Sequence, residues 1–60
     1  MNNREKFLSL YANLPLPLRD EIVLVVDNKP ISWNVAYLEV DANTPLSQEI
    51  LSTLENLQII

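Results

Sequence analysis

The 60-residue chain contains no cysteine, no histidine and no glycine. Without cysteine and histidine it cannot form disulfides or the usual zinc sites. A chain this short buries only about 60% of its unfolded surface, so domains of this size commonly gain stability from a disulfide, a metal or a second subunit. Because hydrophobic residues make up 48% of the chain, oligomerisation is the support that the composition favours.

The same absences argue against an enzyme. General acid–base catalysis at neutral pH usually draws on histidine or on a buried carboxylate, and nucleophilic catalysis needs a hydroxyl or thiol beside a base. Phosphate-binding loops are rich in glycine. The adjacent acids Asp20 and Glu21 stand at the entrance of a predicted strand, where solvated charges are ordinary. We therefore predict no catalytic residue and no cofactor.

Positive charge is scarce and confined to the first half of the chain. The net charge is −4, and every residue after Lys29 is acidic or uncharged. Nucleic acids and anionic membrane surfaces attract clustered Lys and Arg, so neither is an expected partner. No apolar run approaches the roughly 20 residues of a membrane span, and the N-terminus lacks the layout of a signal peptide. With no cysteine in the chain, the expected location is the cytoplasm.

The first predicted element is a helix over residues 4–13. Asn2 is a suitable N-cap with Glu5 three residues later, and Asn13 can supply a left-handed residue at the end. Pro15 disfavours helical backbone before it. An apolar stripe at helical spacing is predicted to face the core and consists of Phe7, Leu10, Tyr11 and Leu14. The following "LPLPL" predicts an extended, polyproline-type connector, more plausibly a stiff linker than a ligand for SH3 or WW domains.

A β-hairpin is predicted next, from "IVLVV" (22–26) through a turn into residues 31–40. Asp27 and Asn28 are the preferred central pair of a two-residue loop, because both tolerate positive φ and Lys29 before proline does not. Pro30 cannot donate a ladder hydrogen bond, so that side of the strand is expected to be exposed. With this loop, the face predicted to join the core comprises Ile22, Leu24, Val26, Ile31, Trp33, Val35 and Tyr37. Trp33 and Tyr37 could also stack on a ligand, but core packing is the simpler interpretation.

Five consecutive apolar residues in a hairpin strand leave no face for water. The second face of the predicted hairpin carries Val23, Val25, Ala36, Leu38 and Val40. This face is too apolar to be fully solvated, and the second strand extends past the first. We therefore expect a second copy of the chain to cover it, in an isologous two-fold dimer.

The last predicted element is a helix that begins after Thr44, a suitable N-cap, with Pro45 at the first helical position. Its stripe toward the core is Leu46, Ile50, Leu54 and Leu57, widened by Leu51. The preceding "EVDANT", with Asp41 and Asn43, is reminiscent of the start of a calcium loop. An EF-hand requires glycine at the sixth position and an acid at the twelfth, whereas Leu46 and Ser52 stand there, so no metal site is predicted.

Together these elements predict an α+β fold, a single α-β-β-α domain over residues 1–60 that homodimerisation completes. The expected function is a small non-catalytic, homodimeric protein-interaction or regulatory module. Its expected partner is a second copy of itself, with another protein as the alternative. The alternative is a small-ligand or divalent-metal-binding accessory protein that uses the Asp41–Asn43 corner or the Trp33–Tyr37 surface.

Overall fold

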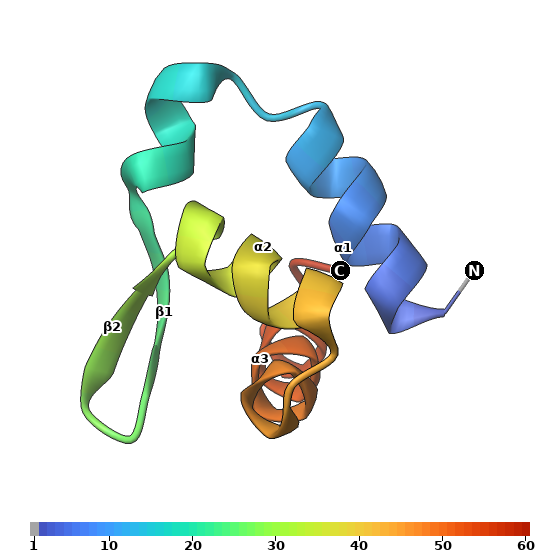
Figure 1. Cartoon of the computed structure of the whole chain (residues 1–60), viewed down its shortest axis with the longest axis vertical. Helices are drawn as coiled ribbons and strands as arrows, with labels where there is room; N and C mark the ends of the chain where they lie inside the picture. The colour runs from blue at the N-terminus through green and yellow to red at the C-terminus, as the bar shows by residue number, and fades with distance from the viewer. Residues whose placement is uncertain (1) are drawn as a thin grey trace.

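The computed structural model describes residues 2–60, which form three α-helices, one 3₁₀-helix and a two-stranded antiparallel sheet. In chain order the elements are α1 (Asn3–Ala12), η1 (Leu16–Asp20), β1 (Ile22–Val26), β2 (Lys29–Ser32), α2 (Trp33–Ala42) and α3 (Pro45–Asn56). In Figure 1, α2 and α3 lie between the hairpin and α1. The predicted α+β class, with a helix before and a helix after a hairpin, is confirmed, and α2 is an additional helix.

Helix α1 begins as the sequence predicts but ends differently. The Asn2 side chain accepts a hydrogen bond of 2.8 Å from the backbone N–H of Glu5, which satisfies one of the free donors of the first turn. Asn13 keeps right-handed backbone, at φ −93° and ψ 0°, so the predicted left-handed terminus is wrong. Its side-chain amide instead donates to the carbonyl of Ser9 at 3.0 Å, which satisfies a terminal carbonyl without positive φ.

The proline segment is a short helix and not the extended connector that we predicted. Pro15 precedes the 3₁₀-helix η1, and the N–H groups of Leu18 and Glu21 donate to the carbonyls of Pro15 and Leu18, each at 3.0 Å. The fixed φ of proline suits the first turn of a helix, where its missing N–H has no partner to lose. Pro17 lies in that first turn, so the two prolines start the turn and do not prevent it.

The predicted hairpin loop is confirmed. Asp27 and Asn28 have φ values of 51° and 66°, the positive values that a two-residue type I′ turn requires. The register places Val26 opposite Lys29, Val25 opposite Pro30 and Leu24 opposite Ile31. The inward face of the hairpin up to Ile31 is therefore as predicted.

Strand β1 contains an irregularity that its sequence does not predict. The register shifts between Ile22 and Leu24, so Ile22 lies opposite Ser32 and not opposite Trp33. An extra residue in one strand reverses the side that the preceding side chain faces. As a result Ile22, predicted to be a core residue, is 55% exposed.

The second predicted strand is wrong from Trp33 onward, because the chain turns there into helix α2. The Ser32 hydroxyl accepts a 3.1 Å hydrogen bond from the N–H of Val35 and caps the helix. Trp33 donates its N–H to the carbonyl of Glu21 at 3.2 Å, where the chain leaves the sheet. The left-handed Asn43, at φ 56° and ψ 44°, ends the helix.

Helix α3 follows the sequence prediction at its start. The Thr44 hydroxyl accepts from the N–H of Ser47 at 3.2 Å, and Pro45 occupies the first helical position. The helix ends at Asn56, so Leu57 lies beyond its last turn and is exposed. The prediction that Leu57 is a core residue is therefore wrong, while Ile60 packs against the edge of the core.

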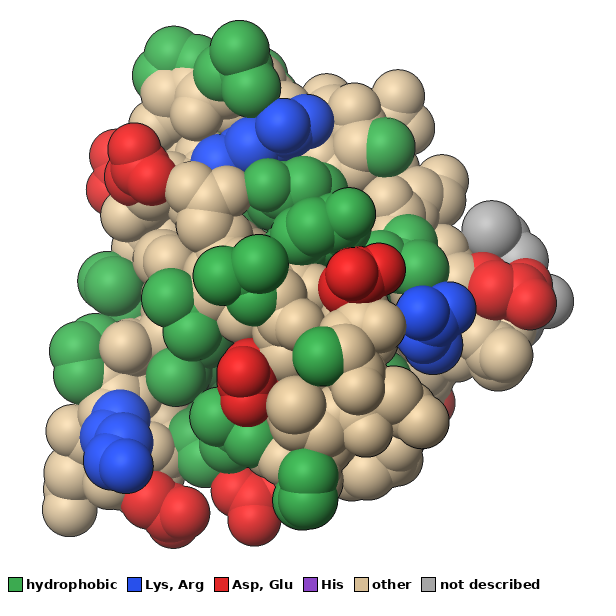
Figure 2. All heavy atoms as spheres, viewed as in Figure 1, with side chains coloured by type: hydrophobic (Ala, Val, Ile, Leu, Met, Phe, Trp, Pro, Cys, Tyr) green, Lys and Arg blue, Asp and Glu red, His purple; other side chains and the backbone are tan. Residues whose placement is uncertain are grey.

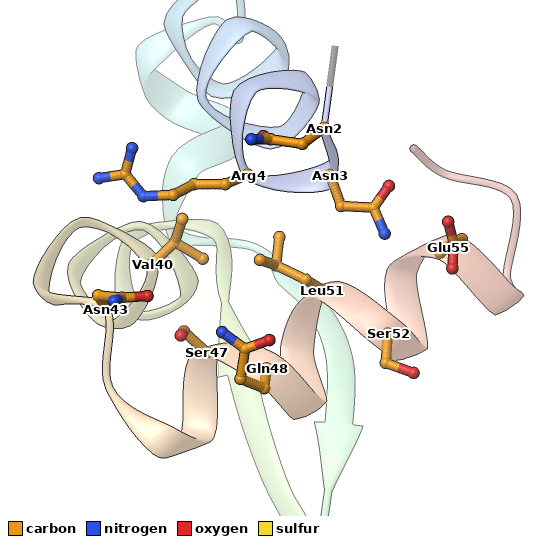
Figure 3. Close-up of a pocket in the computed structure, with 10 residues that line it drawn as sticks. All are labelled: Asn2, Asn3, Arg4, Val40, Asn43, Ser47, Gln48, Leu51, Ser52 and Glu55. Carbon is orange, nitrogen blue, oxygen red and sulfur yellow. The ribbon is translucent and has the colours of Figure 1, made fainter.

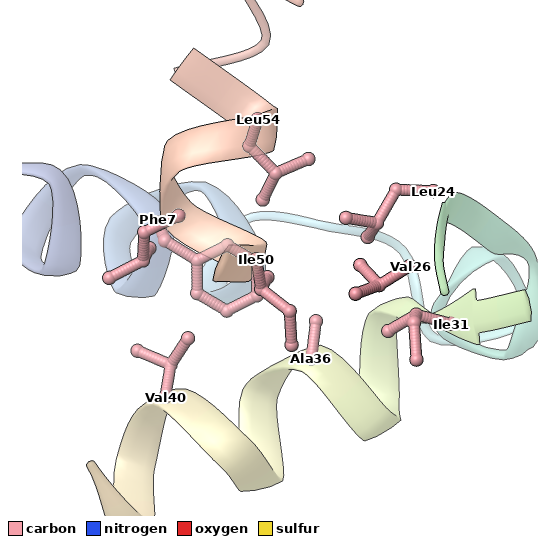
Figure 4. Close-up of a cluster of buried hydrophobic side chains, with 9 residues drawn as sticks. Phe7, Leu24, Val26, Ile31, Ala36, Val40, Ile50 and Leu54 are labelled. Atoms are coloured by element: carbon pink, nitrogen blue, oxygen red, sulfur yellow. The ribbon is translucent and has the colours of Figure 1, made fainter. Parts of the chain in front are cut away.

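The core lies where the hairpin meets the three α-helices. In Figure 4, Leu24, Val26 and Ile31 point from the hairpin toward Ile50 and Ala36. The buried hydrophobic residues are Phe7, Leu24, Val26, Ile31, Ala36, Val40, Ile50, Leu51 and Leu54. Of the other predicted core residues, four are partly buried against this cluster, namely Tyr11, Trp33, Tyr37 and Leu46. Leu10 and Leu14 are half-buried, and Val35 is exposed because it lies on the outer side of α2.

Candidate functional site

The five residues predicted to form the dimer face are divided by the fold. Ala36 and Val40 are buried at exposures of 0% and 1%, and Val23 is partly buried against the core. Their placement on an outer face is wrong, since Ala36 and Val40 lie one helical turn apart on the inward side of α2. Val25 and Leu38 remain outside, at exposures of 60% and 62%.

Exposed apolar side chains come together on neighbouring elements. We call the set Leu18 of η1, Ile22 of β1, and Val35 and Leu38 of α2 the outer apolar surface. Helix α2 contacts η1, and β1 directly follows η1 in the chain. Figure 2 shows hydrophobic side chains over η1, over α2 and along the hairpin on this face of the molecule. Leu18 had no predicted role, and Ile22 and Val35 were predicted to be in the core.

An aromatic cluster connects the same elements, η1 and α2, to α1. The rings of Tyr11 and Tyr37 stack with centroids 4.4 Å apart, and the guanidinium of Arg19 lies 4.3 Å from the centroid of Tyr11. Arg19 also donates to the backbone carbonyl of Tyr11 at 3.2 Å, in the last turn of α1, where positive charge is favoured by the helix dipole. The interactions of Arg19 thus hold η1 against α1.

A chain of side-chain hydrogen bonds extends the cluster to α2. The Tyr11 hydroxyl donates to the side-chain oxygen of Asn34 at 2.6 Å, and the Asn34 amide donates to the carboxylate of Asp20 at 2.7 Å. Trp33 stacks on Phe7 with ring centroids 6.1 Å apart. Trp33 and Tyr37 therefore both stack on rings of their own chain. This arrangement holds α1, η1 and α2 together, and contains no pairing of a nucleophile with a base.

A pocket of about 300 Å³ lies between the start of α1, the end of α2 and α3. In Figure 3, Val40 and Leu51 lie at its centre, with side chains of α1 on one side and of α3 on the other. The polar side chains around it are Asn2, Asn3, Arg4, Asn43, Ser47, Gln48, Ser52 and Glu55. Asn2 and Ser47 already make hydrogen bonds within the chain. The pocket therefore offers neutral amides and hydroxyls, with one charge of each sign.

The Asp41–Asn43 corner is the C-terminal end of α2. Asn43 caps the helix, and the carboxylate of Glu39 accepts a hydrogen bond of 3.0 Å from the Thr44 hydroxyl. Within residues 2–60, no three acidic side chains come together as the ligands of a metal ion would. Among the same residues, 2–60, no helix is long and apolar enough to cross a bilayer.

Fold and surface together define a small α+β domain with an exposed apolar surface beside an aromatic cluster. Comparison of the chain with protein-family models, curated proteins and solved structures finds no match.

Proposed function

We propose that the protein is a small non-catalytic interaction module that forms a homodimer through the outer apolar surface. The observation that carries this proposal is the exposure of Ile22, Val35 and Leu38, which together place three large aliphatic side chains in water. Contiguous exposed apolar side chains commonly mark a protein–protein interface. We also propose that the protein acts in the cytoplasm, as expected for a chain without cysteine.

Two further features support a surface built for contact. The aromatic cluster and the hydrogen bonds of Asn34 hold η1 and α2 in fixed positions, so little conformational freedom is lost when a partner docks. The exposed residues Val35 and Leu38 and the half-buried Tyr37 between them carry no charge. Depletion of charge is characteristic of the centre of an interface.

Sedimentation velocity and concentration-dependent melting test the proposal. We expect the protein to sediment as a dimer at micromolar concentration, with a melting temperature that rises with protein concentration. A double variant, Val35→Lys with Leu38→Lys, should be a folded monomer, because lysines on this surface place like charges opposite each other across the two-fold axis.

A matched control carries the same added charge on another helix. Ser9→Lys with Ala12→Lys introduces two lysines at the same spacing on the exposed side of α1. This control should remain dimeric. A parent protein that is monomeric at all accessible concentrations would overturn the proposal, as would equal loss of the dimer in both double variants.

The alternative, a small-ligand-binding accessory protein, is favoured by the pocket between α1, α2 and α3. Its centre is apolar, and amides from three elements surround it, which is the usual layout of a site for a small polar molecule. Calorimetric titration distinguishes a small-ligand site from a divalent-metal site. Glutamine serves as a neutral amide probe for the first, and Ca²⁺ serves as the probe for the second. Binding of glutamine that is lost in Gln48→Ala, or binding of Ca²⁺ that is lost in Asp41→Ala, would favour this alternative over the interaction module.

A further inference from the structure

A second feature, separate from the outer apolar surface, is a groove between β1 and α3. It has a volume of about 540 Å³. Val25, Val26 and Asp27 line one wall, and the other wall is formed by α3 with Gln48, Glu49 and Ser52. The groove therefore runs beside the C-terminal end of β1.

The strand that borders this groove has an open edge. Val26 and Lys29 flank the two-residue turn, where paired residues exchange both backbone hydrogen bonds, so the next pair, Val25 and Pro30, is not hydrogen-bonded. Pro30 has no N–H, which fits this position. The alternation directs the N–H and C=O of Val25 away from β2, toward the outer edge of β1. One donor and one acceptor are thus available there to an added strand.

The two edges of the hairpin differ in how they are protected. Strand β2 carries Lys29 and Pro30, a charge and an imino acid that block pairing along an edge. Strand β1 is entirely aliphatic, with no proline or charge between residues 22 and 26. The edge of β2 is therefore protected by a charge and a proline, whereas β1 has only the register shift between Ile22 and Leu24, which leaves the edge at Val25 regular.

The charge of the side chains that line the groove determines which kind of peptide it can bind. Its ionisable side chains are Asp27 and Glu49, both acidic and both exposed. A second copy of the chain pairing here would bring its own Asp27 and Glu49 into the same groove, and the chain as a whole has a net charge of −4. Self-pairing at this edge is therefore disfavoured by repulsion, while a basic segment is attracted.

We propose that the groove binds an extended basic peptide segment, which adds to β1 as a third strand. Its backbone pairs with the N–H and C=O of Val25, and its basic side chains lie near Asp27 and Glu49. Strand addition to an exposed edge is an established mode of peptide recognition, in which the main chain supplies affinity and side chains supply selectivity.

Fluorescence anisotropy with three short labelled peptides tests the nature of the ligand. The first alternates lysine with valine, the second has glutamate in place of each lysine, and the third is the lysine peptide with proline at its central position. We expect the lysine peptide to bind and the glutamate peptide to show no saturable binding. The affinity for the proline peptide should be lower by a factor of about ten at least, because its central residue has no backbone N–H to donate to β1.

Two charge-reversed variants of α3 test the location. Glu49→Lys and Glu55→Lys change the net charge equally, and both side chains are exposed, but only Glu49 lines the groove. We expect Glu49→Lys to lower the affinity for the lysine peptide about tenfold and Glu55→Lys to lower it less than about threefold. Hydrogen exchange should show new protection of the Val25 amide when the peptide is bound.

Three results would overturn the proposal. Equal weakening by Glu49→Lys and Glu55→Lys would show nonspecific attraction to an acidic protein. Equal binding of the proline peptide would exclude strand pairing. Dimerisation that is altered by Glu49→Lys, with no binding of the lysine peptide, would assign the groove to a second copy. Because the dimer test uses Val35 and Leu38, which do not line this groove, either proposal can fail without the other.

Discussion

The two sides of helix α2 carry similar residues in opposite environments. Ala36 and Val40 are almost completely buried, while Val35 and Leu38 are 41% and 62% exposed. Nothing in residue type distinguishes the pairs, since all four are aliphatic. The difference shows that the fold buries the aliphatic side chains on one side of α2 and leaves those on the other side in contact with solvent. We therefore expect substitutions on the inner side to change stability, and the proposed dimer predicts that substitutions on the outer side change association.

The largest expected effect is on the inner side. Ala36→Lys places a charge without a partner in the core, at a position that is 0% exposed. Such a substitution costs more than about 4 kcal/mol, which is comparable to the whole stability of a domain this small. We expect loss of cooperative unfolding in thermal circular dichroism. A cooperative transition within a few degrees of the parent would mean that this side of α2 is open.

Next in size is the loss of the central aromatic ring. Phe7 is fully buried and stacks against both Tyr11 and Trp33. Phe7→Ala should lower the free energy of unfolding by about 3–5 kcal/mol, measured by urea denaturation. Leu16→Ala in the exposed η1 is the control and should stay close to the parent. Similar losses in both variants would contradict the placement of the core.

A smaller effect is expected at the end of α2. Asn43 ends the helix in left-handed conformation, at φ 56°, which costs a residue such as alanine roughly 1–2 kcal/mol. Asn43→Ala should therefore reduce stability by about that amount, and Asn43→Gly should leave it nearly unchanged. Chemical denaturation of the two variants measures the difference. Equal stability would indicate that α2 ends elsewhere.

The smallest effect on the stability of a single chain is on the outer side. Leu38→Lys adds a charge at a position that is 62% exposed, where substitutions usually change stability by no more than about 0.5 kcal/mol. At high dilution, where the monomer dominates, the variant should melt with the parent. At high concentration it should melt lower, because only the parent gains stability from association. A large loss at every concentration would place Leu38 in the core.

Local signals in the sequence determined a substantial part of the fold. The Asp27–Asn28 turn, the caps Asn2 and Thr44, and the start of α3 at Pro45 all follow from the side chains at those positions. In each case one residue type satisfies a nearby backbone group or tolerates a specific φ, so the outcome needs no distant contact. The same local rules predicted the inward face of the hairpin as far as Ile31.

The candidate sites were less predictable. Val25 and Leu38 were correctly expected on an outer face, but Ile22 and Val35 were assigned to the core. The open edge of β1 depends on the pairing of Val25 with Pro30, which follows from the predicted turn. The groove beside it could not be predicted, because the distance between β1 and α3 depends on how the whole chain packs.

Only the tertiary structure decided between strand and helix after Ser32. Trp33, Ala36, Tyr37 and Val40 fit a helical spacing, while Trp33, Val35 and Tyr37 fit the alternation of a strand, so periodicity alone left both open. The helix is favoured because it buries Ala36 and Val40 in the core with Ile50 and lets Ser32 cap the first turn. The register shift in β1 likewise depends on where the chain leaves the sheet. Caps and turns are local and can be read from single residues, whereas the side of an element that is buried depends on what packs against it.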